Sequence, residues 1–331
     1  MNLKAVSCLV TLLLAVLGAV PAESAEMSRP TTGPLKVYVT IFIIDVDDIS
    51  GANQSFDANV HVQYRWRDQR LAHKGPKSIV RPLDEIWDPK VQVINQQKIW
   101  LTLPEIVKIS PEGEVLYHQR AWGSFSQPLK LKDFPFDRQV FSFHLATIDY
   151  SPDEIEFVPD KNDESGMAQE LSVADWEIIG YKAEPRPYRP SPATSPLAGF
   201  AFSFEAERKA GYFIIKVIIP LILIVAMSWV VFWIDPIESG TQVSVAITTM
   251  LTLIAYRFAI DTDLPKISYL TRMDFFILLS TVLVYASLIE VVVTSSFAKD
   301  GKISRARTLD LWMRWVFPSL FTIVAVKSLF F

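Results

Sequence analysis

The chain has 331 residues, of which 50% are hydrophobic, and its mean hydropathy of +0.25 is high for a soluble protein, so membrane-spanning segments are expected. The formal net charge of -4 and a pI near 5.7 argue against nucleic acid as a partner. The single cysteine, Cys8, excludes a disulfide within the chain.

Residues 1–24 have the pattern of a secretory signal peptide. Lys4 supplies the charged start, a short apolar run follows, and small residues come next in VPAESA. Cleavage after Ala22 or Ser24 fits best and would also remove Cys8. The alternative is an additional membrane anchor, which the short run and the cleavage pattern disfavour. A secreted chain without cysteine suits a bacterial periplasm.

Residues 25–209 predict an immunoglobulin-like β-sandwich. Apolar and polar residues alternate there in short runs, as in VFSFHL and GFAFSFE, and clusters of Pro, Gly, Asp and Asn separate the runs. The stretch NVHVQYRW places one set of apolar side chains on a single strand face: Val60, Val62, Tyr64 and Trp66. Short strands at regular spacing are typical of a sandwich.

Residues 210–331 predict a four-helix transmembrane bundle. About 20 apolar residues cross a bilayer as a helix. Four stretches are long enough, at about 211–234, 241–260, 273–296 and 309–331.

The charges between the third and fourth spans set the orientation. Lys299, Lys302, Arg305 and Arg307 lie in this link, which the positive-inside rule places in the cytoplasm. Four spans then place the sandwich and the C-terminus on the periplasmic side, in agreement with a signal peptide. We therefore expect a multi-pass protein of the bacterial inner membrane.

The second span carries a polar stripe that lipid would not favour. Its members recur at intervals of four and three residues and share one helix face: Ser244, Thr248, Leu251, Ala255 and Phe258. Acidic residues flank it, with Glu238 before the span and Asp261 and Asp263 after it. Two interpretations stay open on spacing alone. The face lines a water-filled pore in an oligomeric ring, or its small residues let helices pack closely.

Several motifs resemble those of the pentameric ligand-gated ion channels of the Cys-loop receptor superfamily. FPFDRQ at residues 134–139 resembles the family hexapeptide, and Gln127 and Phe141 stand where animal members have their paired cysteines. The chain is therefore similar to the bacterial, cysteine-free branch. Four other stretches also resemble family segments: WRDQRLA, WDPKVQVIN, SWVVFWID and DLPK. The resemblance runs from about residue 35 to the C-terminus.

The resemblance implies a homopentamer with four identical partner subunits, seated in membrane lipid. The second span of each subunit would line a pore for monovalent cations. The implied pore-lining residues are Glu238, Thr241, Ser244, Thr248, Leu251, Ala255, Phe258 and Asp261. ESGTQ before the span resembles the corresponding stretch of cation-selective members, although Thr241 replaces their selectivity glutamate, and the Pro-Ala pair of anion-selective members is absent. We expect Arg257 to point away from the axis, as a snorkelling or interhelical ion-pair residue.

The resemblance also implies a coupling region where the sandwich meets the membrane. Asp137 and Arg208 match a family ion pair at this junction, whose role is coupling or folding alone. Pro265 and Lys266 lie in the link between the second and third spans, which should touch the strand loop at residues 47–52.

The agonist site of the family lies between subunits and is usually lined by aromatic residues. Ile94 and Ile148 stand where animal receptors have a Tyr and a Trp, and His61 replaces another Trp. The other candidates nearby are His118, Arg120, Trp122, Tyr150 and Tyr188. An aromatic box for a quaternary ammonium is therefore incomplete. The ligand is an unknown small molecule or protons, which His61, His118 and the many Asp and Glu residues could bind without the sequence singling out one sensor.

An enzyme and a passive binding module are the two alternatives to a channel. An enzyme would need a nucleophile–base set or metal ligands, but the four histidines are scattered and no Gly-rich phosphate loop is present, so we expect no catalytic residues, metal or cofactor. A periplasmic binding module on a passive membrane anchor would have no reason for an acidic-flanked hydroxyl stripe.

Overall fold

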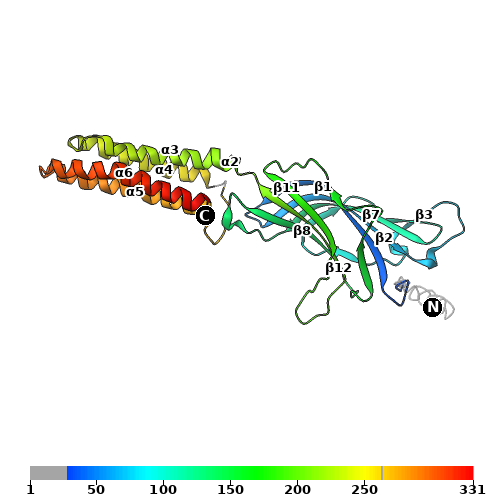
Figure 1. Cartoon of the computed structure of the whole chain (residues 1–331). Helices are drawn as coiled ribbons and strands as arrows, with labels where there is room; N and C mark the ends of the chain where they lie inside the picture. The colour runs from blue at the N-terminus through cyan, green and yellow to red at the C-terminus, as the bar shows by residue number, and fades with distance from the viewer. Residues whose placement is uncertain (1–27, 262–263, 331) are drawn as a thin grey trace, which may run out of the picture.

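The structure is a computed structural model that describes residues 28–261 and 264–330. The predicted signal peptide and Asp263 lie outside these residues. Figure 1 shows two regions in line, with the strands at one end of the molecule and the helices at the other.

The larger sheet of the sandwich has eight strands, six of which follow the order β10-β1-β2-β7-β6-β3, while β5 also pairs with β7 and β9 with β1. Its strands are β1 (Leu35–Ser50), β2 (Ser55–Arg67), β3 (Ile79–Pro82), β5 (Gln96–Leu101), β6 (Ile106–Ile109), β7 (Glu114–Ser126), β9 (Ile155–Pro159) and β10 (Gly166–Met167). Strands β9 and β10 run parallel to β1, and the other pairs are antiparallel.

The smaller sheet has four antiparallel strands in the order β11-β12-β8-β4. Its strands are β4 (Val91–Val93), β8 (Arg138–Thr147), β11 (Trp176–Pro185) and β12 (Gly199–Arg208). The two sheets form the predicted β-sandwich, which is confirmed.

Aromatic side chains fill the space between the sheets. The predicted inward face of β2 is buried, with Trp66 only 1% exposed. Phe56 on the larger sheet contacts Phe143 and Phe204 on the smaller one, with ring centroids 5.1 Å and 5.9 Å apart. Since each large aromatic ring buries considerable apolar area, this cluster supplies much of the driving force for joining the sheets.

Four helical segments are long and apolar enough to cross a membrane: Gly211–Trp233, Pro236–Ile260, Arg272–Lys299 and Ile303–Leu329. The named helices are α2 (Gly211–Phe213), α3 (Ile219–Val230), α4 (Ser239–Ile260), α5 (Arg272–Lys299) and α6 (Ile303–Phe330). A π-helical turn, Ile214–Ile218, joins α2 to α3. The α6 helix runs from the far end of the bundle back toward the sandwich, so its end and the sandwich lie on the same side (Figure 1).

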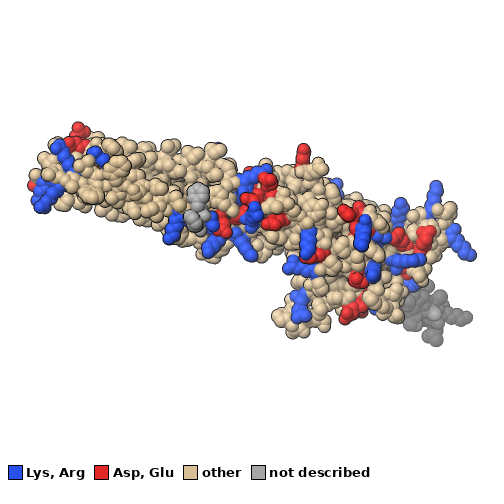
Figure 2. All heavy atoms as spheres, viewed as in Figure 1, with Lys and Arg blue, Asp and Glu red and all other residues tan. Residues whose placement is uncertain are grey.

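The fourth helix begins at Ile303, six residues before the start expected from the sequence. Arg305 and Arg307 lie in its first turns rather than in a loop, and Arg307 forms an ion pair with Asp235 at 2.7 Å. The apolar pattern alone missed these turns because charged side chains can project from a helix beyond the hydrocarbon layer. Figure 2 shows charged side chains at this far end of the bundle and at its junction with the sandwich, with few between.

Candidate functional site

The predicted pore stripe lies on the exposed side of α4. Thr241, Ser244, Thr248 and Ala255 are exposed, as are Leu251 and Phe258, whose exposed fractions reach 61% and 79%. The opposite side packs into the bundle through Gln242, Ala246, Thr249, Leu253 and Ile260. The stripe therefore does not pack against the other helices of its own subunit.

Two threonine hydroxyls on this side of α4 donate hydrogen bonds back to the helix backbone. Thr248 Oγ1 donates to the Ser244 carbonyl at 2.8 Å, and Thr252 Oγ1 donates to the Thr248 carbonyl at 2.8 Å. A hydroxyl whose hydrogen is used in this way can offer only its lone pairs to a neighbouring species. The surface therefore presents oxygen acceptors, which suit a cation.

Acidic side chains lie at both ends of α4. Glu238 is exposed just before the helix, and Asp261 is exposed just after it. Asp261 forms an ion pair with Lys266 at 3.4 Å, so part of its charge is compensated. Arg257 is also exposed, one position from Phe258 and about 100° away around the helix.

Asp137 and Arg208 form a buried ion pair where the sandwich meets the bundle. Arg208 Nε lies 2.8 Å from Asp137 Oδ1, and the two side chains are 9% and 1% exposed. The Arg208 guanidinium also lies over the Trp176 ring, 4.2 Å from its centroid, and Gln139 donates to Asp137 Oδ2 at 2.7 Å. These contacts satisfy the charged groups in a buried site, as burial of a charge requires.

The segment around the FPFDRQ motif also contacts the membrane helices. Arg272 at the start of α5 forms an ion pair with Asp133 at 2.9 Å, and the Tyr269 hydroxyl accepts a hydrogen bond from the Leu131 amide at 3.0 Å. A Cβ atom at Gly51 would lie 3.5 Å from Pro265 Cβ. The loop after β1 therefore packs against the α4–α5 link at Pro265, as the sequence predicted, whereas Lys266 pairs with Asp261.

Four of the predicted ligand residues lie together on strands β2 and β7. The His61 and His118 rings stack at 5.3 Å, and Arg120 donates to the Asn59 side chain at 2.9 Å. Trp122 donates to Asp47 at 2.9 Å. This group combines two imidazoles, a guanidinium and an indole on one sheet.

The other four ligand residues lie on loops and strand ends of the smaller sheet. Ile94 follows β4, Ile148 and Tyr150 follow β8, and Tyr188 lies between β11 and β12, bridged to Leu197. Ile148 is 48% exposed, whereas Ile94, Tyr150 and Tyr188 are half-buried. One subunit therefore carries two separate groups of candidates on different sheets.

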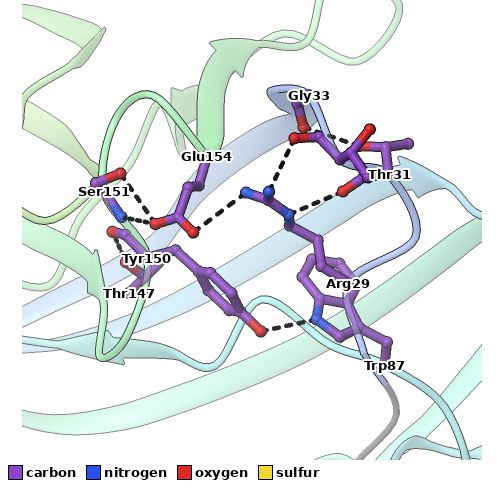
Figure 3. A network of polar contacts seen from close by, with 9 residues as sticks. Arg29, Thr31, Gly33, Trp87, Thr147, Tyr150, Ser151 and Glu154 are labelled. Atoms are coloured by element: carbon purple, nitrogen blue, oxygen red, sulfur yellow. Dashed lines mark hydrogen bonds and ion pairs between the residues drawn. The ribbon is translucent and has the colours of Figure 1, made fainter.

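The Tyr150 hydroxyl is bonded to a side chain from another segment of the same subunit. It accepts a hydrogen bond from Trp87 Nε1 at 2.9 Å, and the Tyr150 carbonyl accepts one from Thr147 Oγ1 at 2.7 Å (Figure 3). The next turn is held by Glu154, which accepts from the Ser151 amide at 3.0 Å and lies 3.6 Å from Arg29. The Tyr150 hydroxyl is therefore already used in a contact within the subunit.

The sequence reading missed Trp100, which belongs to the group on β2 and β7. Trp100 lies on β5, is 45% exposed and stacks on Trp122 at 4.9 Å, with Lys98 4.8 Å from its centroid. The available signal in the sequence was a Trp within the short alternating stretch QKIW.

Burial changes the acid–base behaviour of the histidine pair. Desolvation lowers the pKa of both His61 and His118 below the ordinary value, and each is opposed by the nearby Asp163 charge. The two rings therefore favour their neutral forms. Among residues 28–261 and 264–330, no group of three or more His, Cys, Asp or Glu side chains is placed to hold a metal ion.

A sandwich followed by four membrane-crossing helices defines a multi-pass membrane protein with an extracellular domain. Residues 23–210 match the neurotransmitter-gated ion-channel ligand binding domain, and residues 217–302 match the neurotransmitter-gated ion-channel transmembrane region. The chain belongs to this family, the Cys-loop superfamily of pentameric ligand-gated channels, and is a cysteine-poor member. The family consists of channels rather than enzymes.

One relative is the gamma-aminobutyric acid receptor subunit beta-4 of Gallus gallus. It is 30% identical to this chain over 273 residues, a stretch that covers 79% of this chain. The chain spans 56% of that relative's length.

Proposed function

We propose that this ligand-gated channel is a homopentamer that passes monovalent cations across a bacterial inner membrane. The observation that carries the proposal is the α4 stripe, which faces away from its own bundle and includes the Thr248 hydroxyl, whose hydrogen is already bonded to the Ser244 carbonyl. A single helix cannot enclose a path, so several copies around an axis are needed, and members of this family assemble as pentamers.

The charges at the ends of α4 support cation selectivity. Five copies of Glu238 and Asp261 would place negative rings at the two mouths, and field focusing in a narrow path concentrates cations. Thr241, near the cytoplasmic mouth, adds an oxygen without a charge. Arg257 opposes this field only if its side chain faces the axis. Its position lies about 100° around the helix from Phe258, so the side chain points away from the stripe.

The gate in this proposal is a ring of Leu251 side chains. Leu251 lies midway along α4 on the stripe, between Thr248 and Phe258. A narrow apolar ring loses its water readily, so it blocks ions without closing completely. Ala255 leaves space above the ring.

The ligand site is proposed to form between neighbouring sandwiches. The group around Trp122 from one subunit would face the loops that carry Ile94, Ile148, Tyr150 and Tyr188 of the next. Gamma-aminobutyric acid, for which the relative is named, carries an amine and a carboxylate. The guanidinium of Arg120 and the exposed indoles could bind such groups, so small amines and carboxylates are the first compounds to screen. Protons are the alternative ligand.

Current measurements test this proposal. The full chain would be expressed and recorded while pH and candidate ligands are varied, and the reversal potential would be measured in a sodium chloride gradient. We expect reversal near the sodium equilibrium potential. Reversal near the chloride equilibrium potential would overturn cation selectivity, and a protein that reaches the membrane without passing current under any condition would overturn the channel proposal.

A further inference from the structure

A buried polar cluster lies inside the helix bundle, away from the pore stripe. Gln242 on α4, Glu290 on α5 and Asp310 on α6 are 0%, 6% and 1% exposed. Gln242 lies in the first turn of α4, Glu290 in the second half of α5 and Asp310 in the first half of α6. Carboxyl groups in this setting are costly and mark functional sites in membrane proteins.

The hydrogen bonds of the cluster are incomplete. Gln242 Nε2 donates to the Ile234 carbonyl at 2.9 Å and to Asp310 Oδ2 at 3.3 Å. Both carboxyl oxygens of Glu290, Oδ1 of Asp310 and Oε1 of Gln242 have no donor among the described residues. Buried oxygens of this kind normally accept a hydrogen bond, so the pattern indicates that one of the two carboxyl groups carries a proton that it can donate.

The two carboxyl groups are within hydrogen-bonding reach of each other. Two ionised carboxylates only accept hydrogen bonds, so they cannot bond to one another. Like charges that lie next to each other also repel. If one of them carries a proton, the contact becomes a charge-assisted hydrogen bond.

The other charged groups facing the cluster are already engaged. Arg314 on α6 donates from Nε to the Phe232 carbonyl at 2.9 Å, and its guanidinium lies over the Trp233 ring at 4.5 Å. Asp235, in the link before α4, is paired with Arg307 at 2.7 Å. Arg314 therefore offsets only part of the negative charge.

We propose that Glu290 and Asp310 share a proton and form a proton-binding site inside the membrane-spanning bundle. The shared proton forms a hydrogen bond between Glu290 on α5 and Asp310 on α6. Gln242, near the cytoplasmic end of the proposed pore helix α4, donates to the same Asp310 carboxyl group. Deprotonation at high pH leaves two like charges in contact and separates the helices. The stabilisation is therefore present at low pH and lost as pH rises through the titration of the pair.

Infrared difference spectroscopy tests the bound proton on the full chain in lipid. A buried carboxylic acid has a carbonyl band distinct from that of a carboxylate. We expect this band in the wild-type protein and its loss in both Glu290→Gln and Asp310→Asn. Asp300→Asn is the matched control, because Asp300 is an exposed carboxylate beside Lys302 at the end of α5. Persistence of the band in both cluster variants would overturn the proposal.

Thermal unfolding against pH gives a second reading that does not depend on current. The wild-type midpoint should fall as the pH becomes alkaline, whereas Glu290→Gln should be nearly flat because an amide keeps the hydrogen bond without a titrating proton. A parallel fall in the two proteins would contradict a shared proton. Stabilisation that requires added calcium or magnesium, without the acid band, would instead assign the site to a cation. Any effect on gating rests on the proposed channel function, but these two measurements do not.

Discussion

Arg208 Nε donates to Asp137 Oδ1 at 2.8 Å, although the two residues are 71 positions apart in the chain. Arg208 ends β12 directly before the first membrane helix, and Asp137 belongs to the segment that contacts the start of α5. The ion pair therefore links the covalent connection from β12 to the first membrane helix with the segment that packs against the start of α5.

Removing either charge should destabilise this junction. Asp137→Asn leaves the Arg208 guanidinium without its counter-charge in a buried site, and breaking a buried pair costs about 3–5 kcal/mol. We expect lower surface assembly and impaired gating. Arg208→Lys should also be impaired, because an ammonium cannot reproduce the stacking on Trp176. A double-mutant cycle on the open–closed equilibrium measures the coupling, and strictly additive effects would count against it.

Tyr188 and Trp122 are predicted to set ligand potency. Tyr188→Ala and Trp122→Ala should shift the half-maximal ligand concentration and leave single-channel conductance unchanged, because neither residue lies near the pore stripe. Tyr150→Ala should additionally reduce expression, since it removes the acceptor for Trp87. Dose–response curves alongside surface labelling separate the two effects. Unchanged potency in all three variants would place the site elsewhere.

The Leu251 ring is predicted to be the gate. Leu251→Ser should wet the constriction and favour the open state, seen as leak current or higher ligand sensitivity. Ile254→Ser is a matched control, because Ile254 is 42% exposed on α4 and is turned about 60° away from Leu251 around the helix. A Leu251→Ser channel that needs more ligand and shows no leak would mean that the gate is misplaced.

Glu238 is predicted to contribute more to selectivity than Asp261. Asp261 is partly neutralised by Lys266 at 3.4 Å, whereas Glu238 has no side-chain ion pair among the described residues. Glu238→Gln should therefore move the reversal potential toward zero in a sodium chloride gradient more than Asp261→Asn does. Equal shifts, or none, would show that the mouths of the path do not set selectivity.

The stacked histidines predict a loss of stability in acid. Burial lowers the pKa of His61 and His118, so the folded state favours the neutral rings and the unfolded state binds protons at higher pH. Stability is present above the ordinary histidine value and falls as pH drops through the lowered pKa. His118→Gln should flatten thermal unfolding in that range, with His73→Gln as the control. An unchanged pH profile in His118→Gln would contradict this assignment.

The sandwich could be predicted from the sequence because side chains on a strand alternate between two faces. The apolar set from Val60 to Trp66 could therefore be assigned to the core without knowing which strands it contacts. The Asp137–Arg208 pair came only from resemblance, since distant contacts leave no local pattern. Glu290 and Asp310 were missed because they lie on different helices, 20 residues apart in the chain, and only packing shows that they meet. The start of α6 was missed because its charged side chains resemble a loop.

The separation of the candidate ligand residues onto two sheets has a genetic consequence. If each site joins the strand group of one subunit to the loop group of the next, a Trp122 variant and a Tyr188 variant are damaged on opposite faces. Expressed alone, either variant has every site impaired. Expressed together, they assemble mixed rings in which some junctions pair two undamaged faces, so two insensitive alleles should complement each other and restore part of the ligand response.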